Sequence, residues 1–351
     1  MQYYMPTRLI TGKDVVVENA ELIGSYGKKT LIVTGANSAK KCGALDDVVK
    51  ALESQQVEYK VYDGICQNPT MASCEEAADI AKKFGAEFII GIGGGSPLDA
   101  AKVVAKKAAD KTLPIVLVGT TAGTGSEVTK VAVITNDEGF KKSQKSDDMY
   151  AQVAFGDPKY TMTLSREFTA STAIDALAHC VESYFSKKAN EISRGTALQG
   201  IAILLKELPK IAAGEELSYE TRENLYDASI LGGLSIAVTG TIFCHNVGYY
   251  FTEHFKLPHG VACAITMPAL MKHVMKADPE YTQDFYKRLG TDEKAFVSLV
   301  EAVLPEVDCL MTEAMIDELL PRWENNASVM STIGTVTTQY IKVILMEMFV
   351  K

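Results

Sequence analysis

The sequence has few cysteines, and it lacks both a leader-peptide pattern and a long apolar run. Its seven cysteines are scattered and odd in number, with no CxxC pair, which argues against a disulfide framework and is typical of a reducing cytosol. The N-terminus does not place a basic segment before an apolar one, and no run reaches the ~18 apolar residues of a membrane span. We therefore expect a cytoplasmic protein with no membrane partner.

Positive charge is also scarce, because 35 Lys and Arg residues face 44 Asp and Glu residues and leave a formal net charge of −9. No basic block compensates for this excess of acid, so we expect no nucleic-acid partner. Hydrophobic residues make up 47% and charged residues 23% of the chain, an ordinary composition for a globular protein. The length of 351 residues is enough for two domains with a large core.

The first part of the chain alternates short apolar runs with helical patterns. Buried parallel strands are followed by helices across short turns, which predicts a doubly wound, mostly parallel α/β sheet. We also expect residues 131–135 and 153–155 to form a hairpin arm. The other expected strands are 31–35, 57–62, 87–91 and 115–118, and the expected helices are 44–52, 71–84 and one that begins at Pro97.

The pattern changes after Asp157-Pro158, and from Ser165 onwards it is almost only helical. We therefore predict a dinucleotide-binding α/β domain over residues 1–160 and an all-α domain over residues 161–351. The cleft between two domains is the usual place for a ligand. The expected helices are 166–187, 189–212, 219–237, 240–253, 261–276, 279–287, 292–302, 309–318, 324–331 and 335–349.

Two loops rich in small residues follow neighbouring strands. The first, GIGGGSPLDAAK at 91–102, combines a strand, a glycine turn and a helix start. Such a turn lets the backbone approach a pyrophosphate, which the helix N-terminus then holds, although a simple tight βα turn is the alternative. The second loop, 119–126, offers hydroxyl groups suited to ribose and phosphate from Thr120, Thr121, Thr124 and Ser126.

The end of the first strand bears on which dinucleotide is bound. An acidic residue there would bind both ribose hydroxyls and repel a 2′-phosphate. Here the chain reads Gly35-Ala36-Asn37-Ser38 and then Lys40-Lys41, with no carboxylate before Asp46. Gly35, Asn37, Ser38 and Lys41 therefore favour NADP(H) over NAD(H), unless this segment is only a solvated turn.

Few histidines are present, and three of them suit a metal site together with one aspartate. Asp175 and His179 lie four residues apart in an apolar run, so on a helix both point to one side. His245 and His259 would complete a set that suits Fe(II) or Zn(II) better than Mg(II) or Ca(II). Taken singly, each histidine is more simply explained as a hydrogen-bonded core residue. His254 is a further candidate on the cleft side.

Four motifs together resemble the iron-containing (group III) alcohol dehydrogenases over essentially the full chain. They are GGGSPLDAAK, TTAGTGSEVT, DALAHCVESY and HNVGYYFTEHFKLPHG. The resemblance implies metal ligands at Asp175, His179, His245 and His259. It places the family's glycine loop at Gly93, Gly94, Gly95, Ser96 and Asp99, and its nicotinamide-side loop at Thr120, Thr121, Thr124 and Ser126. Lys141 is similar to the family lysine that reaches the cofactor.

The chain departs from the family pattern at two positions. Many members carry another histidine four residues after the third ligand, where this chain has Tyr249. Many NAD-using members end the first strand in Asp, where this chain has Gly35, and the stretch GANSAKK is more similar to the NADP(H)-using butanol dehydrogenase branch. Glycerol dehydrogenase typically has Lys-Thr after the glycines, where this chain has Ser96-Pro97.

These features predict a metal-dependent oxidoreductase that transfers a hydride between NADP(H), or NAD(H), and a small primary alcohol or aldehyde. We expect Fe(II), with Zn(II) as the alternative, to act as a Lewis acid, and a homo-oligomer such as a dimer. A water, the cofactor ribose or His254 would deliver the proton. The alternatives are a maleylacetate-reductase-like, glycerol-dehydrogenase-like or dehydroquinate-synthase-like enzyme of the same fold, and a non-catalytic cofactor-binding protein.

Overall fold

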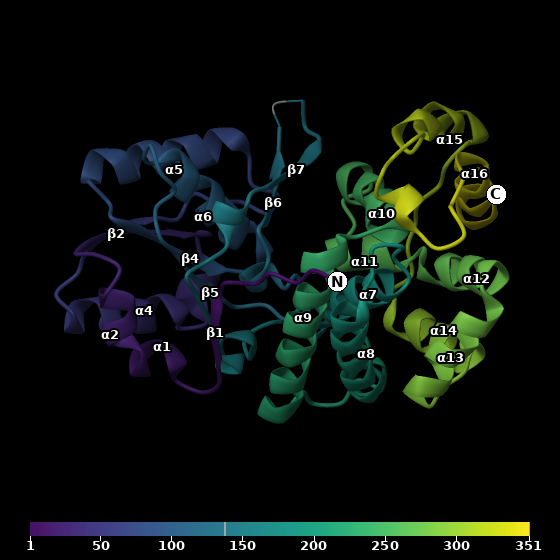
Figure 1. The fold of residues 1–351 in the computed structure, drawn as a ribbon, viewed down its shortest axis with the longest axis horizontal. Coiled ribbons are helices and arrows are strands. Elements are labelled where there is room, and N and C mark those ends of the chain that lie inside the picture. The colour runs from purple at the N-terminus through teal and green to yellow at the C-terminus, as the bar shows by residue number, and fades with distance from the viewer. Residues whose placement is uncertain (137, 351) are drawn as a thin grey trace.

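A six-stranded parallel sheet forms the centre of the N-terminal half (Figure 1) in the computed structural model, which describes residues 1–136 and 138–350. The strand order is β1-β8-β5-β4-β2-β3, and every pairing in this sheet is parallel. Strands β4 and β5 are buried at every residue, as expected for strands covered on both faces. The strands are β1 (Arg8–Thr11), β2 (Lys29–Thr34), β3 (Glu58–Tyr62), β4 (Phe88–Gly93), β5 (Ile115–Gly119) and β8 (Val153–Gly156).

Helices cover both faces of this sheet, which confirms the doubly wound fold. Alternate residues of β2 enter different cores: Leu31 and Val33 pack with residues of α5 and α6, whereas Ile32 packs with residues of α4. Figure 1 shows α5 and α6 on one side of the sheet and α1, α2 and α4 on the other. The helices are α1 (Val15–Glu18), α2 (Ala20–Gly24), α3 (Ser38–Lys41), α4 (Ala44–Ser54), α5 (Met71–Phe84) and α6 (Gly95–Lys107).

The hairpin arm differs from the expected one. Strand β6 (Val131–Thr135) pairs antiparallel with β7 (Lys141–Lys145), whereas residues 153–156 form β8 in the main sheet. The predicted pairing of 131–135 with 153–155 is therefore wrong. The reason is burial. Strand β8 reads VAFG and is completely buried between β1 and β5. Strand β7 lies on the surface, and its charged sequence KKSQK does not have the apolar pattern by which a strand is recognised.

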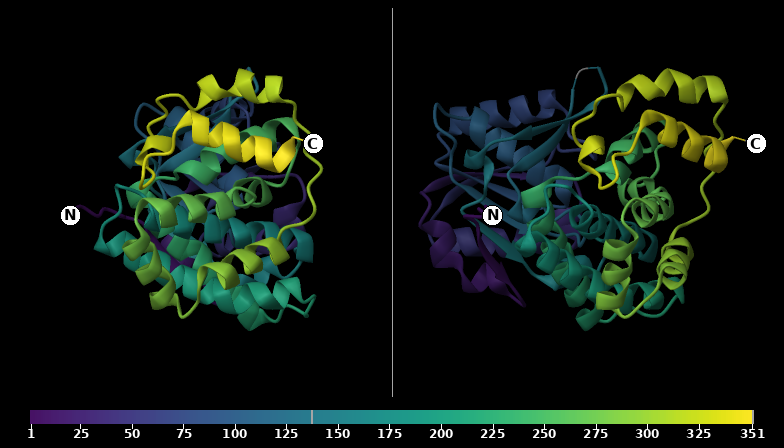
Figure 2. Two further views of the ribbon diagram at one scale, coloured as in Figure 1. Left: turned by 90° about the vertical axis from the view of Figure 1, so that its right-hand side faces the viewer. Right: turned by 45° about the vertical axis from the view of Figure 1, so that its right-hand side comes forward.

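The C-terminal half is helical, as predicted (Figure 2), with α16 on the side away from the sheet. The expected helix 261–276 is two helices, broken at Ile265 and Thr266, and the expected helix 324–331 is only a short 3-10 turn at Val329–Ser331. The boundary at residue 160 stays a prediction. The helices are α7 (Arg166–Tyr184), α8 (Glu191–Ala212), α9 (Tyr219–Thr239), α10 (Phe243–His254), α11 (His259–Ala264), α12 (Met267–Ala277), α13 (Pro279–Leu289), α14 (Glu293–Val303), α15 (Glu313–Leu319) and α16 (Thr338–Phe349).

Within the described ranges, no single helix has both the length and the apolar composition needed to cross a membrane. Helices α9 and α10 meet that requirement only when counted together, and they are bent by 109° at the break between them. Eight of the twelve residues of α10 are buried in the protein.

Two glycines let helices α7, α10 and α11 approach one another closely. A Cβ on Gly248 of α10 would lie 2.7 Å from the carbonyl oxygen of Ala262 on α11. A Cβ on Gly260 of α11 would collide with the backbone oxygen of Ser171 on α7. These contacts are to backbone atoms, which cannot move aside as a flexible side chain can. The two glycines therefore fix the spacing of the three helices.

We expect Gly248→Ala to destabilise the protein by about 1–3 kcal/mol, because the added methyl group overpacks a contact with the backbone of α11. Denaturant unfolding followed by circular dichroism measures this change. The matched control is Gly195→Ala on α8, where an added Cβ meets nothing within 4 Å. That control should be neutral or stabilising by about 0.5–1 kcal/mol, because alanine favours helix. Equal stability of the two variants would contradict the packing argument.

Candidate active site

Helix α7 presents three buried polar side chains on one face. Asp175, His179 and Glu182 are spaced four and then three residues apart, which places them on successive turns of the same side. The helix begins at the cap Ser165, whose hydroxyl accepts from the backbone N–H of Phe168. Fourteen of its nineteen residues are buried, so this polar row lies inside the protein.

His245 of α10 lies between the two carboxylates of α7. Its Nδ1 contacts Glu182 Oε2 in a very short hydrogen bond, and its backbone N–H donates to Glu182 Oε1 at 3.2 Å. An ionised carboxylate can only accept, so Nδ1 carries the proton. Burial lowers the pKa of His245, but Cys263 and Glu182 raise it well above its usual value, so Nε2 offers a lone pair only when a metal ion takes the place of the second proton. Nε2 lies 3.3 Å from Asp175 Oδ1. Glu182 therefore fixes both the tautomer and the direction of His245.

His179 is fixed in a similar way by the backbone. Its Nδ1 lies 3.2 Å from the carbonyl oxygen of Gly123, so Nδ1 donates and Nε2 is left unprotonated in the neutral ring. The ring stacks on His245 with centroids 4.4 Å apart. Burial lowers the pKa of His179, which keeps the imidazole neutral and able to bind a metal.

His259 begins α11, and its ring lies close to Asp175 and His245. Burial, helped by the positive charge of Lys141, lowers the pKa of His259 to about 3, although Asp175 acts in the opposite direction. The ring is therefore neutral at ordinary pH. It stacks on Tyr249, with centroids 5.8 Å apart and planes 5° apart, and part of its surface opens into the cavity.

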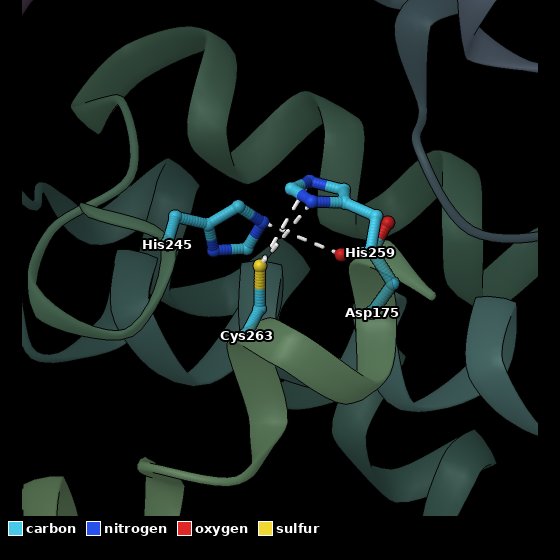
Figure 3. A group of neighbouring side chains, drawn as sticks. All are labelled: Asp175, His245, His259 and Cys263. Atoms are coloured by element: carbon cyan, nitrogen blue, oxygen red, sulfur yellow. Dashed lines mark hydrogen bonds and ion pairs between the residues drawn. The ribbon is translucent and has the colours of Figure 1, made fainter. Parts of the chain in front are cut away.

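Two residues that the sequence analysis did not name lie beside Asp175 and the histidines. Glu182 orients His245. The side chain of Cys263 points toward those of Asp175, His245 and His259 (Figure 3). Both were readable from spacing, because Glu182 follows Asp175 by seven residues and Cys263 follows His259 by four. Neither residue type stood out in a sequence with many glutamates and scattered cysteines.

The donor set fits a cation. Asp175 Oδ1 and His245 Nε2 are both fully buried and have no hydrogen-bond partner, although they are 3.3 Å apart. Two acceptors at that distance repel each other unless a proton or a metal ion lies between them. Burial would raise the pKa of Asp175, but the neighbouring rings of His179, His259 and His245 lower the pKa more strongly, so the carboxyl is ionised. One anionic oxygen with three imidazole nitrogens is a set that suits Fe(II) or Zn(II).

A cavity of about 580 Å³ connects this group to the carboxyl end of the parallel sheet. It reaches from Gly35, at the end of β2, to the histidines of α7, α10 and α11. Most of the residues that the sequence analysis proposed for the cofactor and the metal line it. They are Gly35, Ser38, Gly94, Gly95, Ser96, Asp99, Thr120, Thr121, Thr124, Ser126, Lys141, Asp175, His179, His245 and His259.

The two small-residue loops touch each other at the floor of this cavity. A Cβ on Gly94 would lie 2.9 Å from Thr121 Cγ2, and a Cβ on Gly95 would lie 2.9 Å from Thr124 Cγ2. Helix α6 begins at Gly95, two residues before the expected start at Pro97, so the glycines themselves form its first turn. Gly94, Gly95 and Ser96 line the cavity, and the first N–H groups of a helix have no partner within it, which suits a pyrophosphate.

Asp99 lines the cavity, but its carboxylate is already bound by the protein. Its Oδ1 accepts from the Ser126 hydroxyl at 2.6 Å, and its Oδ2 accepts from the backbone N–H of Val133 at 2.8 Å. The buried Lys102 ammonium lies 3.7 Å away and donates to the carbonyl oxygen of Ser126 at 2.7 Å. Asp99 therefore ties α6 to the second loop and to β6.

The structure does not bring four of the proposed residues to the cavity. His254 is exposed at the end of α10 and packs on Tyr250, with ring centroids 4.3 Å apart. Asn37 and Lys41 are exposed on α3 and its cap. Gly93 is buried at the end of β4, where a side chain would collide with Pro97.

Comparison with known proteins gives two family matches along the chain. A model described as iron-containing alcohol dehydrogenase matches residues 6–158, and one described as the C-terminal part of the Fe-containing alcohol dehydrogenase family matches residues 169–334. Alcohol dehydrogenase 4 of Schizosaccharomyces pombe is 32% identical over 337 residues, which cover 90% of this chain and 78% of that protein.

Two solved structures are similar over nearly the whole chain. An iron-containing alcohol dehydrogenase from Thermotoga maritima is 32% identical, with a TM-score of 0.90 over 99% of this chain and 98% of that one. A sulfoacetaldehyde reductase from Bifidobacterium kashiwanohense, solved in complex with NAD+, is 26% identical, with a TM-score of 0.89 over 98% of this chain and 97% of that one.

We expect Glu182→Gln to weaken metal binding by about 10–100-fold, because a neutral amide orients His245 less strongly and lowers its basicity. Competition with a chromogenic chelator measures the affinity for Fe(II) or Zn(II). The control is Glu207→Gln, another buried carboxylate, which accepts from Lys210 and Asn224 on helices outside the site. Unchanged affinity in Glu182→Gln, with both variants folded by circular dichroism, would contradict this role.

Proposed function

Because the chain belongs to the iron-containing alcohol dehydrogenase family and is an alcohol dehydrogenase, we propose that it transfers a hydride between NADP(H) and a small primary alcohol or aldehyde with Fe(II) bound. The observation that carries the proposal is the pair of buried, unpartnered atoms Asp175 Oδ1 and His245 Nε2, which face each other in the same cavity as the glycine loop. One cavity therefore joins a cation site and a pyrophosphate site.

Four residues would hold the metal: Asp175, His179, His245 and His259. Gly123 and Glu182 hold the Nδ1 atoms of His179 and His245, which leaves Nε2 of each ring for the metal, and Asp175 supplies one negative charge. A divalent metal bound by them supplies Lewis acidity toward the substrate oxygen. Zn(II) accepts the same donors, so the choice of Fe(II) rests on the family.

The glycine loop and the second loop would hold the dinucleotide. Gly94, Gly95 and Ser96 would offer the N-terminal N–H groups of α6 to the pyrophosphate, and Thr120 and Thr124 line the same cavity. The nicotinamide supplies the hydride. The close approach of Gly95 to Thr124 fixes the glycine loop relative to the second loop. The cofactor would therefore be oriented by a rigid surface at the bottom of the cavity.

Lys141 and Tyr249 form the cavity wall beside His259. The Lys141 ammonium lies 5.7 Å from the centre of the Tyr249 ring, and burial lowers its pKa while Cys263, Glu253 and Asp175 act in the opposite direction. Burial raises the pKa of Tyr249 to about 12, so its hydroxyl stays protonated and can donate to a substrate oxygen. The role of proton donor considered for His254 has no support from its exposed position.

The cavity charge favours an alcohol dehydrogenase over the dehydroquinate-synthase-like alternative. Among the described residues that line the cavity, the cationic side chains are Lys141 and Lys145, both on β7. A polycarboxylate substrate would need more positive charge near the metal. A small, neutral alcohol or aldehyde needs none.

The end of β2 supports NADP(H). Gly35 and Ser38 line the cavity there, and the carboxylates among its described lining residues are Asp99 and Asp175, neither of which is on β2 or α3. Nothing acidic on that lining would repel a 2′-phosphate. Lys41 is exposed, and Lys40 is paired with Asp63 at 3.1 Å. The proposed preference for NADP(H) therefore rests more on the lack of a carboxylate that would repel the 2′-phosphate than on lysines that would bind it.

We also propose a cytoplasmic homo-oligomer. All seven cysteines are free, which suits a reducing compartment. Strand β1 lies at the edge of the six-stranded sheet, and the residues before it expose Tyr3 and Tyr4. Such an edge is available for pairing with a second copy of the chain.

The activity test is a panel of small aldehydes with NADH and NADPH in parallel, after loading with Fe(II) or Zn(II). We expect metal-dependent loss of the absorbance of the reduced nicotinamide. His259→Ala should abolish both metal content and turnover, whereas His254→Ala, at an exposed histidine outside the cavity, should change neither. Absence of turnover with every metal and both cofactors would overturn the proposed function.

Cofactor choice is tested at Gly35. We expect Gly35→Asp to raise the KM for NADPH by about tenfold or more and to lower that for NADH, because a carboxylate there repels a 2′-phosphate and binds ribose hydroxyls. The matched control is Ala36→Asp, which adds the same charge at an exposed residue outside the cavity. Equal effects of both variants on KM would point to overall charge and not to a ribose contact.

A further inference from the structure

Lys102 carries a buried positive charge that the proposed mechanism does not use. It lies on α6, two helical turns after the glycine loop, and its side chain is completely buried. Lysine is almost never fully buried unless its ammonium group is paired. Among the described residues Lys102 does not line the cavity, so it would touch neither the dinucleotide nor the substrate.

The Lys102 ammonium binds the second loop and the strand that follows it. It donates to the carbonyl oxygen and to the hydroxyl oxygen of Ser126, both at 2.7 Å, and to the carbonyl oxygen of Val131 at 2.9 Å. These three acceptors satisfy the three N–H bonds of an ammonium. Asp99 Oδ1 lies 3.7 Å from the same nitrogen and accepts from the Ser126 hydroxyl at 2.6 Å. Ser126 is therefore held by both charged side chains.

Gly95, Asp99 and Lys102 lie on one side of α6, because they are spaced four and then three residues apart. They meet the second loop in the same order. Gly95 approaches Thr124 in the first turn of the helix. Asp99 and Lys102 both bind Ser126 further along, and Lys102 also reaches β6, which lies beside α6 (Figure 1). The second loop is therefore held against α6 over two helical turns.

The position of the second loop bears on the dinucleotide. Ser126 lines the cavity, and Gly95 belongs to the turn that would hold the pyrophosphate. A shift of the loop along α6 would therefore move one side of the cofactor site relative to the other. A role in folding alone is the alternative, because an apolar residue in place of Lys102 would leave buried carbonyl groups of Ser126 and Val131 without this donor.

Asp99 and Lys102 stabilise each other's charge. Burial lowers the pKa of Lys102 and raises the pKa of Asp99, while the attraction between the two groups acts against burial in both. Removal of one group would leave the other buried without its partner, whereas removal of both leaves no unpaired charge of this pair. A double variant therefore separates the contribution to stability from the contribution to cofactor binding.

We propose that Lys102 is a positioning residue for the dinucleotide, which fixes the second loop relative to the glycine loop through its contacts with Ser126. This inference rests on the proposed function with NADP(H) or NAD(H) and adds a residue to it. The ammonium binds no part of the cofactor. Its effect is to keep the two loops at the separation that the dinucleotide needs.

The experiment compares wild type with Lys102→Met, Asp99→Asn and the double variant. The fluorescence of the reduced nicotinamide gives the dissociation constants of NADPH and NADH, and circular dichroism gives the thermal midpoint of unfolding. Lys102→Met should weaken dinucleotide binding by about tenfold or more and lower the midpoint. In the double variant the midpoint should recover most of this loss, whereas binding should stay weak, because the ammonium contacts to Ser126 are still missing.

The matched control is Lys106→Met, which removes the same charge from an exposed position on α6, where Lys106 is paired with Asp148 at 3.5 Å. It should change neither reading, and an equal loss of binding in this variant would overturn the inference in favour of an effect of overall charge. If Lys102→Met alone does not fold, the double variant decides.

Two further results would overturn the inference and leave the proposed function intact. One is dinucleotide binding by Lys102→Met that equals that of wild type. The other is binding that recovers together with the midpoint in the double variant, which would assign Lys102 to folding alone. Failure of wild type to bind either dinucleotide would overturn the proposed function and this inference with it.

Discussion

The structure depends on the burial of two carboxylates, Asp175 and Glu182, two turns apart on α7. Removing two negative charges from water costs several kcal/mol each unless partners compensate. Glu182 is compensated by the N–H groups of Ile242 and His245 and by the His245 ring. Asp175 Oδ1 accepts no hydrogen bond and lies 3.3 Å from Nε2 of His245. Under the proposed metal-dependent function, a bound cation would compensate this second buried charge.

Three helices each contribute a pair of residues four apart to the candidate metal site. Helix α7 provides Asp175 with His179, α10 provides His245 with Tyr249, and α11 provides His259 with Cys263. One pair would fit an ordinary hydrogen-bonded core. The three pairs converge because Gly248 and Gly260 allow backbone contact between the helices, so the candidate metal site is set by main-chain packing as much as by its own side chains.

The fold was largely readable from sequence because its signals are local. Helix α5 has the predicted bounds, and the central strands begin and end within a few residues of the predicted ones. The misplaced hairpin shows the limit: strand β7 carries the charged sequence KKSQK, and only its partner β6 makes it a strand. Such a pairing arises from tertiary contacts, which a pattern of single residues does not contain. The helix break at Ile265 and Thr266 did have a local signal that the sequence analysis missed, because Pro268 lies in the first turn of α12.

The candidate site was also predicted in part from local sequence signals, and the remaining part depends on tertiary contacts. Spacing and resemblance named the residues of α7, α10 and α11 that converge, but they assigned Asp99 to the cofactor, where its carboxylate is occupied by Ser126 and the backbone of Val133. A carboxylate that holds both loops can still govern cofactor binding, because it sets where the Ser126 hydroxyl and the first turn of α6 lie. Its influence then acts through position and not through contact. The sequence shows which residues belong to a site, whereas the geometry shows which of them are free to touch the ligand.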